Sequence, residues 1–550
     1  MLEYLSYIAK DSYKQILMLS TTFVLFLSII VYLFPNISTD FFAILVTIYV
    51  ITAIQIILVS YYKIKYSLDK DLQYFLTYIY SISFTTTNIK RFFQILSESE
   101  EYPEISKVIK RIIYISEKYN FTFPEAIRYV LPYIVNCEFK GFLERLSTAL
   151  ETGEDLPSFL EREHKKALEN FDVRYRKGLE NVRILQEIGV SIMSSLAFVF
   201  VIILILPIIM QINIFTIFIY FITTFISANA IIYFLSRYFI PEDQLWIPYK
   251  EKPDNYLKLK NLFVLLLSVS ILIFSISYRI FQNTLICFSI SILPLMYISY
   301  KFGLLEKQVK KKEEKFSSFY NTIISLSGVF GTNQVKILES AKIHDFGELN
   351  NDINNLYNRI IITRNYKSSW YYFIIEIGSN LISKIITPFY KMLEHGGEIE
   401  EASKKLYDVL LKVLELRSFK IQFIAGARGF LYGGFIAFSA VLFVTTFITA
   451  MMKTLFESLS TLVSAEIGGM LGIPLFEINI DIKILEEIIN LLIIFQAFMI
   501  SITLRNVDGG SKFGIFIDFA LLIWIATGIY IITNMFFGQI LPSFMQVPSP

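Results

Sequence analysis

The sequence predicts an all-α, polytopic membrane protein in which one structural plan occurs twice. Hydrophobic residues make up 54% of the 550 residues, and the mean hydropathy is +0.54. Only 18% of the residues are charged, against about a quarter in ordinary soluble proteins. Two long charged stretches, 61–188 and 301–428, each lie between pairs of uncharged apolar windows. We therefore expect about nine transmembrane helices and two helical bundles arranged as a tandem repeat.

Each apolar window is long enough to cross a bilayer as a helix. At a rise of about 1.5 Å per residue, about 20 apolar residues span the hydrocarbon core of about 30 Å. The windows are 17–34, 41–60, 189–211, 213–236, 261–280, 282–300, 429–452, 487–504 and 515–537. The expected domains are a transmembrane pair (1–60), a first bundle (61–188), a pair (189–236), a loop (237–260), a pair (261–300), a second bundle (301–428), three transmembrane helices (429–537) and a tail (538–550).

Basic residues predict the orientation, because Lys and Arg are retained on the cytoplasmic side of a membrane. With the N-terminus inside, the cytoplasmic connections include Lys63, Lys65, Arg237, Lys250, Lys252, Lys258, Lys260, Lys301, Lys307, Arg505 and Lys512. The opposite side receives short turns, the tail and an outer loop near 453–486. The only basic residues in this loop are Lys453 and Lys483. We therefore expect both bundles in the cytoplasm and the C-terminus outside the cell membrane.

In the first bundle, apolar residues recur at helical spacing on both sides of Gly153. Asp155 and Pro157 are typical of a helix start, and an apolar stripe continues from Leu156 to Val182 toward the span near residue 189. We expect a turn at Gly153 followed by one long helix that enters the membrane. Pro124 before Glu125 predicts a further helix start.

The second bundle repeats this pattern around Gly396 and Gly397. An apolar stripe from Ile399 to Val413 follows the glycine pair and leads toward the span near residue 429. Gly396 is thus the expected counterpart of Gly153. One-sided apolar stripes on several helices of each stretch indicate antiparallel helical bundles.

Three segments carry a resemblance to a known family. They are Tyr102-Pro-Glu-Ile105, the run from Phe142 to Leu160 that reads FLERLSTALETGEDLPSFL, and Val507-Asp-Gly-Gly-Ser-Lys512 leading to Trp524; Gly396-Gly397-Glu398-Ile399 is a weaker match. The chain resembles, over nearly its whole length, the type II secretion F superfamily, and within it the archaeal platform proteins of type IV filaments, the archaellum J proteins and their pilus relatives. The resemblance implies a membrane platform that couples a cytoplasmic secretion ATPase to the insertion of pilin- or archaellin-like subunits.

No motif in the sequence predicts catalysis or a cofactor. The phosphate-binding loop G-x-x-x-x-G-K-[S/T] is absent, and Gly509-Gly-Ser-Lys512 predicts a tight turn instead. His164, His344 and His395 are far apart and have no second ligand at helical spacing, so no metal site is expected. The net charge of +2 indicates no general attraction to nucleic acid. We therefore expect no enzymatic activity.

The alternative is a polytopic membrane carrier or a lipid-handling enzyme, which would need ionisable groups inside the membrane. Asp518 is the one ionisable residue that lies clearly inside a window, about one turn from its cytoplasmic end. There its carboxylate can reach water, so we expect an anchor rather than a proton relay. The sequence therefore favours the platform.

Two groups of residues are candidate contacts for the ATPase. Basic clusters lie where the bundles meet the membrane, and they either bind anionic lipid headgroups or dock an acidic motor. Their members are Arg174, Arg176 and Lys177 in the first bundle and Lys310, Lys311 and Lys312 in the second. If these clusters are lipid anchors, the turns are the alternative contact, namely Gly153, Glu154 and Asp155 and the equivalent Gly396, Gly397 and Glu398.

Small residues open the third and seventh spans at equivalent places. They are Ser191 and Ser195 in the third span and Gly429 and Gly433 in the seventh. Small residues four apart let two helices approach closely in lipid. Two interpretations remain open, helix packing within one chain or the seam of a homodimer.

Overall fold

The computed structural model describes residues 68–69, 71–84, 88–99, 101–134, 137–209, 214–240, 243–247, 253–395, 399–462 and 482–545. Within these ranges the regular secondary structure is helical, apart from one bridge between Trp246 and Ser379. The predicted spans 17–34 and 41–60 and the turn at 396–398 lie outside the described residues, as does most of the outer loop.

Short helices precede the first long helix. They are α3 (Leu72–Ser83), α4 (Ile89–Ser97), α5 (Pro103–Tyr119), α6 (Phe123–Val130), η1 (Leu131–Tyr133) and α7 (Glu138–Thr152). The predicted start of α6 is confirmed, because Thr122 and Glu125 form a capping box there. The predicted turn after α7 is also confirmed: Gly153 caps the helix with a φ of +71°, a left-handed conformation that favours glycine.

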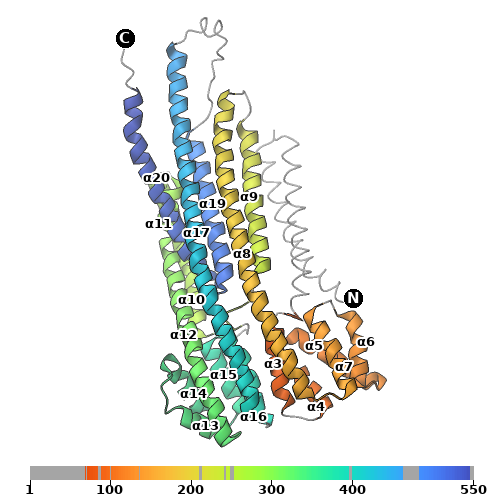
Figure 1. The fold of residues 1–550 in the computed structure, drawn as a ribbon. Helices are drawn as coiled ribbons and strands as arrows, with labels where there is room; N and C mark the ends of the chain where they lie inside the picture. The colour runs from red at the N-terminus through yellow and green to blue at the C-terminus, as the bar shows by residue number, and fades with distance from the viewer. Residues whose placement is uncertain are drawn as a thin grey trace.

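Three long helices pass without a break from the bundles into the apolar half of the molecule (Figure 1). They are α8 (Leu156–Ile209), α12 (Leu293–Phe330) and α17 (Ile399–Leu462). With 54 and 64 residues, α8 and α17 extend about 80 and 95 Å at about 1.5 Å per residue. The long helix that the stripe after Gly153 predicts is therefore present as α8.

The second bundle is completed by short helices between α12 and α17. They are α13 (Gln334–Ala341), η2 (Gly347–Leu349), α14 (Asn350–Thr363), α15 (Tyr366–Ile377) and α16 (Asn380–His395). Both stretches thus end with a helix of about four turns followed by a very long one, α7 with α8 and α16 with α17. The tandem repeat of the whole plan stays a prediction.

The chain is a multi-pass membrane protein. Among the described residues, five helices are long and apolar enough to cross a membrane: α8, α10 (Asp254–Phe281), α17, α19 (Ile482–Asp508) and α20 (Ile515–Met545). The predicted span 213–236 corresponds to α9 (Ile214–Phe239), which is not among these five. The count of about nine spans is therefore not confirmed.

The predicted span 282–300 is bent. It consists of α11 (Thr284–Ser291) and the start of α12, which meet at an angle of 41° and together make a sixth candidate span. Pro294 lies in the first turn of α12. Proline lacks an N–H, and its ring clashes with the preceding turn of a helix, so the chain breaks there.

The two bundles pack against each other as one body. Buried side chains from both stretches, such as Phe75 and Phe139 of the first and Tyr320 and Phe389 of the second, belong to a single apolar core. Helix α3 contacts α8, α16 and α17, so it lies between the two bundles. The apolar stripes predict which faces are buried, but they do not say which helix covers them.

His164 is buried in this core on the part of α8 that precedes the membrane segment. Its exposed fraction is 4%, its ring stacks on Tyr80 with centroids 6.1 Å apart, and its Nε2 has no hydrogen-bond partner. Burial lowers the pKa of His164 to about 4, and the positive charge of Lys405 adds to this effect. The imidazole is therefore neutral at physiological pH.

We expect acid to destabilise the bundles through His164. The unfolded chain takes up a proton on this residue near pH 6.5, whereas the folded protein does so only near pH 4. Stability should be unaffected above pH 6.5 and should fall as the pH drops toward 4, by about 3 kcal/mol in total. Thermal unfolding of the purified protein across this range would measure the effect. His164→Phe, which keeps the stacked ring but cannot titrate, should flatten the pH dependence; an unchanged slope would assign the effect to other groups.

Candidate functional site: a charged junction

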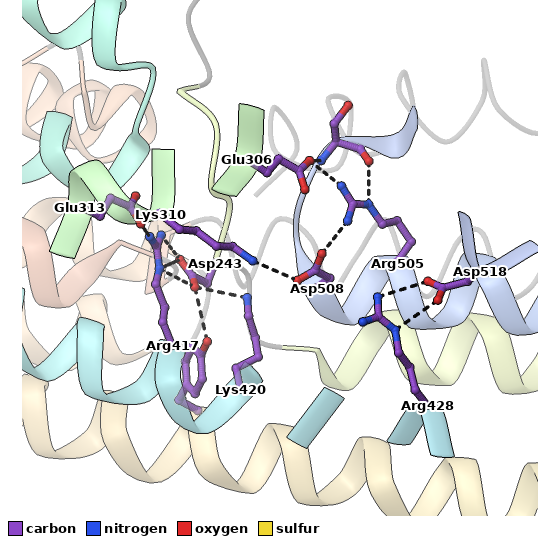
Figure 2. A network of polar contacts seen from close by, with 12 residues as sticks. Asp243, Glu306, Lys310, Glu313, Arg417, Lys420, Arg428, Arg505, Asp508 and Asp518 are labelled. Carbon is purple, nitrogen blue, oxygen red and sulfur yellow. Dashed lines mark hydrogen bonds and ion pairs between the residues drawn. The ribbon is translucent and has the colours of Figure 1, made fainter. Parts of the chain in front are cut away.

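A network of paired charges lies where the bundles meet the membrane helices (Figure 2). Five acidic side chains are matched by five basic ones, so the formal charges cancel. The members are Asp243, Glu306, Glu313, Asp508 and Asp518 with Lys310, Arg417, Lys420, Arg428 and Arg505. We call this network the charged junction. Its residues come from the two ends of the predicted second bundle, from the loop 237–260, from the connection between the last two spans and from the start of the last span.

Arg417 of α17 is the centre of one half of the charged junction. Its Nε lies 2.9 Å and its Nη2 2.6 Å from the two carboxylate oxygens of Asp243, and its Nη1 donates to Glu313 of α12. Lys420 Nζ lies 3.3 Å from Asp243, and the Tyr175 hydroxyl of α8 donates to the same carboxylate at 3.4 Å. The side chain of Glu313 is only 2% exposed. Three long helices thus converge on one buried ion-pair network.

Burial alone would raise the pKa of Asp243, because it disfavours the charged carboxylate. The charges of Arg417 and Lys420 outweigh burial, so the pKa of Asp243 lies well below its usual range. Asp243 is therefore ionised at neutral pH. Its ion pairs with Arg417 and Lys420 hold the helices together there.

Residues 243–247, which we call the strap, connect three parts of the chain at this level. The strap residue Leu245 donates to Gly509 O at 3.4 Å and accepts from Asn380 N at 3.0 Å. Ile247 N donates to Gly378 O at 3.0 Å. Gly378 ends α15, Asn380 begins α16 and Gly509 follows α19, so the strap ties the second bundle to the end of a membrane helix.

Arg505 of α19 is the centre of the other half. Its Nη1 lies 2.5 Å from Asp508, its Nε donates to Ser511 O at 2.7 Å, and its Nη2 donates to Glu306 of α12. Glu306 also accepts the N–H of Ser511 at 2.6 Å. Lys310 Nζ lies 3.5 Å from Asp508 and so links this half to the next turn of α12.

The turn between α19 and α20 has glycine where no side chain would fit. Gly509 has a φ of +73°, and a Cβ there would lie 2.5 Å from Asp243 O. A Cβ on Gly510 or Gly514 would lie 2.4 Å from an atom of the Arg505 guanidinium. The tight turn predicted for Gly509 to Lys512 is therefore confirmed, and its glycines allow backbone and ion pairs to meet.

The carboxylate of Asp518 was expected to reach water, but the structure buries it. It is buried, with Arg428 Nε at 3.2 Å and the Tyr432 hydroxyl donating at 2.7 Å. The proximity of Arg428 on α17 explains the difference, since a buried carboxylate needs a paired charge. Asp518 thus links α20 to α17 as part of the charged junction.

The basic clusters form ion pairs within the chain. Lys310, Lys311 and Lys312 pair with Asp508, Glu348 and Asp352, with the last two distances at 2.9 and 2.7 Å. Arg174 lies 3.3 Å from Glu138, and Arg176 lies 3.0 Å from Asp172 and 2.7 Å from Glu415 of α17. Lys177 is exposed. Because the other five residues of the two clusters are paired, reversing their charges would also break ion pairs within the chain.

The turn at Gly153, Glu154 and Asp155 is exposed at one end of the first bundle. Glu154 pairs with Arg162, and Asp155 accepts the N–H of Ser158 at 3.1 Å to begin α8. The equivalent turn of Gly396, Gly397 and Glu398 lies outside the described residues.

A patch of exposed aromatic and basic residues near this turn was not predicted. Its tyrosines are 44–57% exposed, and ring contacts of about 6 Å connect Tyr119 to Phe121 and Tyr129, and Tyr129 to Tyr133. Arg111 lies over the Tyr133 ring, and Lys118 lies over the Tyr114 and Tyr119 rings. We call Arg111, Tyr114, Lys118, Tyr119, Phe121, Tyr129 and Tyr133 the tyrosine patch. The frequent tyrosines of residues 114–133 are the sequence signal that could have indicated it.

Gly429 and Gly433 do not pack α17 against another described helix. A Cβ on either residue would meet no atom within 4 Å among the described residues. Gly434 makes the close approach instead, since its Cβ would lie 2.8 Å from Val190 of α8. Ser191 and Ser195 are exposed as well. No close approach at these four residues is seen among the described helices, and both interpretations, packing within the chain and the homodimer seam, stay predictions.

Two relatives match the chain over nearly its whole length. The flagella accessory protein J of Methanocaldococcus jannaschii is 27% identical over 526 residues, which cover 92% of each chain. The flagella accessory protein J of Methanococcus voltae is 24% identical over 498 residues, or 88% of each chain. No family model matches the sequence, and no solved structure matches it. The similarity to the two relatives covers the bundles and the membrane helices together.

Proposed function

This chain belongs to the family of the archaeal flagella accessory protein J, and on that premise we propose that it is the membrane platform of archaellum assembly. The platform couples a cytoplasmic secretion ATPase to the insertion of archaellin-like subunits into the filament. It has no catalytic activity of its own in this proposal, since the sequence contains no phosphate-binding loop. The distribution of Lys and Arg supports cytoplasmic bundles, an N-terminus inside and a C-terminus outside.

The observation that carries the proposal is the continuity of the long helices through the charged junction. Helices α8, α12 and α17 run unbroken from the bundles into the membrane half, so a displacement of the bundles moves the membrane segments as well. Buried ion pairs between α12, α17 and the strap oppose sliding of the helices, because separating them would leave unpaired buried charges. Such an arrangement transmits mechanical work across the membrane surface.

The tyrosine patch and the turn at Gly153 to Asp155 together offer the docking surface for the ATPase. Arg128 of α6 pairs with Glu151, two residues before Gly153, so the two features are neighbours at one end of the bundle. Tyrosine and arginine are the residues that most often dominate binding energy at protein interfaces. The basic members of the patch favour an acidic partner surface.

We expect Tyr129→Ala to weaken binding of the cognate ATPase about tenfold or more, because an aromatic anchor would be lost. The measurement is the affinity of the ATPase for the purified full-length chain in nanodiscs. Tyr366→Ala on α15 is a matched control, since Tyr366 is 42% exposed and Tyr129 is 46% exposed. The control should bind the ATPase as tightly as the wild type.

Two further measurements make this test decisive. A cysteine introduced at Ser158 should react with a membrane-impermeant thiol reagent only after cells are permeabilised, because the proposal places the turn in the cytoplasm. The chain alone should hydrolyse no ATP above background. Reaction of the cysteine in intact cells, or equal affinities for the Tyr129→Ala and Tyr366→Ala variants, would contradict the proposed docking surface.

A further inference from the structure

A second polar cluster lies at the end of the membrane helices opposite the charged junction. Its residues come from the start of α11, the first turns of α19 and the second half of α20. Glu486 accepts hydrogen bonds from Asn283 Nδ2 at 3.1 Å and from the Tyr530 hydroxyl. Glu487 accepts the N–H of Thr284 through its Oε1 at 3.4 Å. Two adjacent carboxylates thus face the beginning of α11.

Three oxygens of this cluster have no hydrogen-bond partner. They are Glu487 Oε2, Thr284 Oγ1 and Asn490 Oδ1. Asn490 is 0% exposed, and its amide nitrogen also has no partner. It follows Glu486 by four residues and Glu487 by three, so it lies one turn deeper on the same face of α19. Unpaired polar groups are costly in apolar surroundings, so a ligand that satisfies these oxygens would stabilise the helices.

We propose that these oxygens bind a hard metal cation between α11 and α19. Carboxylate, amide and hydroxyl oxygens are the ligands that Ca²⁺ and similar hard cations prefer, and water completes their coordination. Glu487 supplies Oε2, Thr284 supplies Oγ1 and Asn490 supplies Oδ1. Glu486, held by Asn283 and Tyr530, adds negative charge beside the site.

The ligand set distinguishes this site from those of softer metals. Zinc and other transition metals favour histidine and thiolate ligands. Within the described parts of the chain, no three His, Cys, Asp or Glu side chains lie together as a metal site. Calcium and sodium ions are both hard cations that bind oxygen ligands, so the experiment must distinguish between them.

The test uses the full-length protein purified in detergent and stripped with a chelator. Its unfolding temperature should rise with added CaCl₂ and reach a plateau, and NaCl titrated against choline chloride at equal ionic strength tests the monovalent ion. Glu487→Gln should weaken the apparent affinity for the cation about tenfold or more. Glu339→Gln, an exposed glutamate on α13, is the matched control and should respond like the wild type.

Substitutions of Asn490 give an independent outcome. Asn490→Leu should lose the cation-dependent rise, and Asn490→Asp, which adds a carboxylate, should bind the cation more tightly. A wild-type protein that responds to neither ion would overturn the proposal, as would equal responses of Glu487→Gln and Glu339→Gln. An unchanged cation response of Asn490→Leu, together with a higher unfolding temperature, would also overturn the proposal, because Asn490 would then be an unsatisfied amide and not a ligand. Because the readout is thermal unfolding, the test does not depend on the proposed role in archaellum assembly.

Discussion

Replacing Arg417 with methionine should destabilise the protein by about 3–5 kcal/mol and abolish filament assembly. The substitution leaves the carboxylates of Asp243 and Glu313 buried without their main partner, while methionine fills a similar volume. Unfolding by titration with a denaturing detergent in mild micelles would measure the loss. Counting filaments on cells that express the variant would measure assembly.

The controls separate the buried ion pairs from charge in general. Arg183→Met removes an arginine of α8 whose side chain is 60% exposed and should leave stability close to that of the wild type. Adding Asp243→Asn to Arg417→Met should recover part of the loss, because one unpaired charge disappears. A loss for Arg417→Met no larger than that for Arg183→Met would show that the charged junction does not hold the helices together.

Gly509→Ala should have the second largest effect, a loss of about 3 kcal/mol or more. The left-handed backbone at Gly509 costs a residue with a Cβ about 1–2 kcal/mol. The added Cβ would also lie 2.5 Å from Asp243 O, and relieving such overpacking typically costs about 1–3 kcal/mol. The strap must move away, which loosens the tie between α19 and the second bundle. Denaturing-detergent titration and filament counts again provide the measurements.

Substitutions at two other glycines separate the cost of the left-handed backbone from the cost of the contact with Asp243. Gly153 has a similar φ of +71°, but no atom of the described residues lies within 4 Å of an added Cβ, so Gly153→Ala should show the backbone cost alone. An added Cβ on Gly433 would also meet no described atom within 4 Å, and Gly433 lies inside a helix, so Gly433→Ala should cause no loss of stability. Equal losses for Gly153→Ala and Gly509→Ala would show that contact with the strap contributes nothing.

The helices and their ends were largely predictable because their signals are local. Helical spacing of apolar residues predicts α8 and α17. Glycine in the sequence marks the turns at Gly153 and Gly509. Pro124 and Glu125 begin α6 as expected. Proline also explains the bend between α11 and α12, but apolar composition alone predicts one span at 282–300. A hydropathy window records apolar composition and does not detect that proline lacks a backbone N–H.

The charged junction was not predicted, although some of its residues were noted. Arg505 was counted only as a basic residue that sets orientation, and Lys310 as a candidate contact for the ATPase. The partner of Arg417 is Asp243, 174 residues away, and no local rule connects them. Similarly, the exposure of Gly433 and the close contact of Gly434 depend on how α17 is rotated against α8.

Composition and periodicity therefore determine that the chain is an all-α membrane protein, because the thickness of a bilayer and the pitch of a helix act on each segment separately. The glycine turns follow equally from local backbone geometry. Which charges are buried together, and which small residues face outward, depends on contacts between segments far apart in the sequence. Only the packed arrangement shows that Asp243, Glu313 and Arg417 meet, because the guanidinium of Arg417 stabilises both carboxylates in their buried positions.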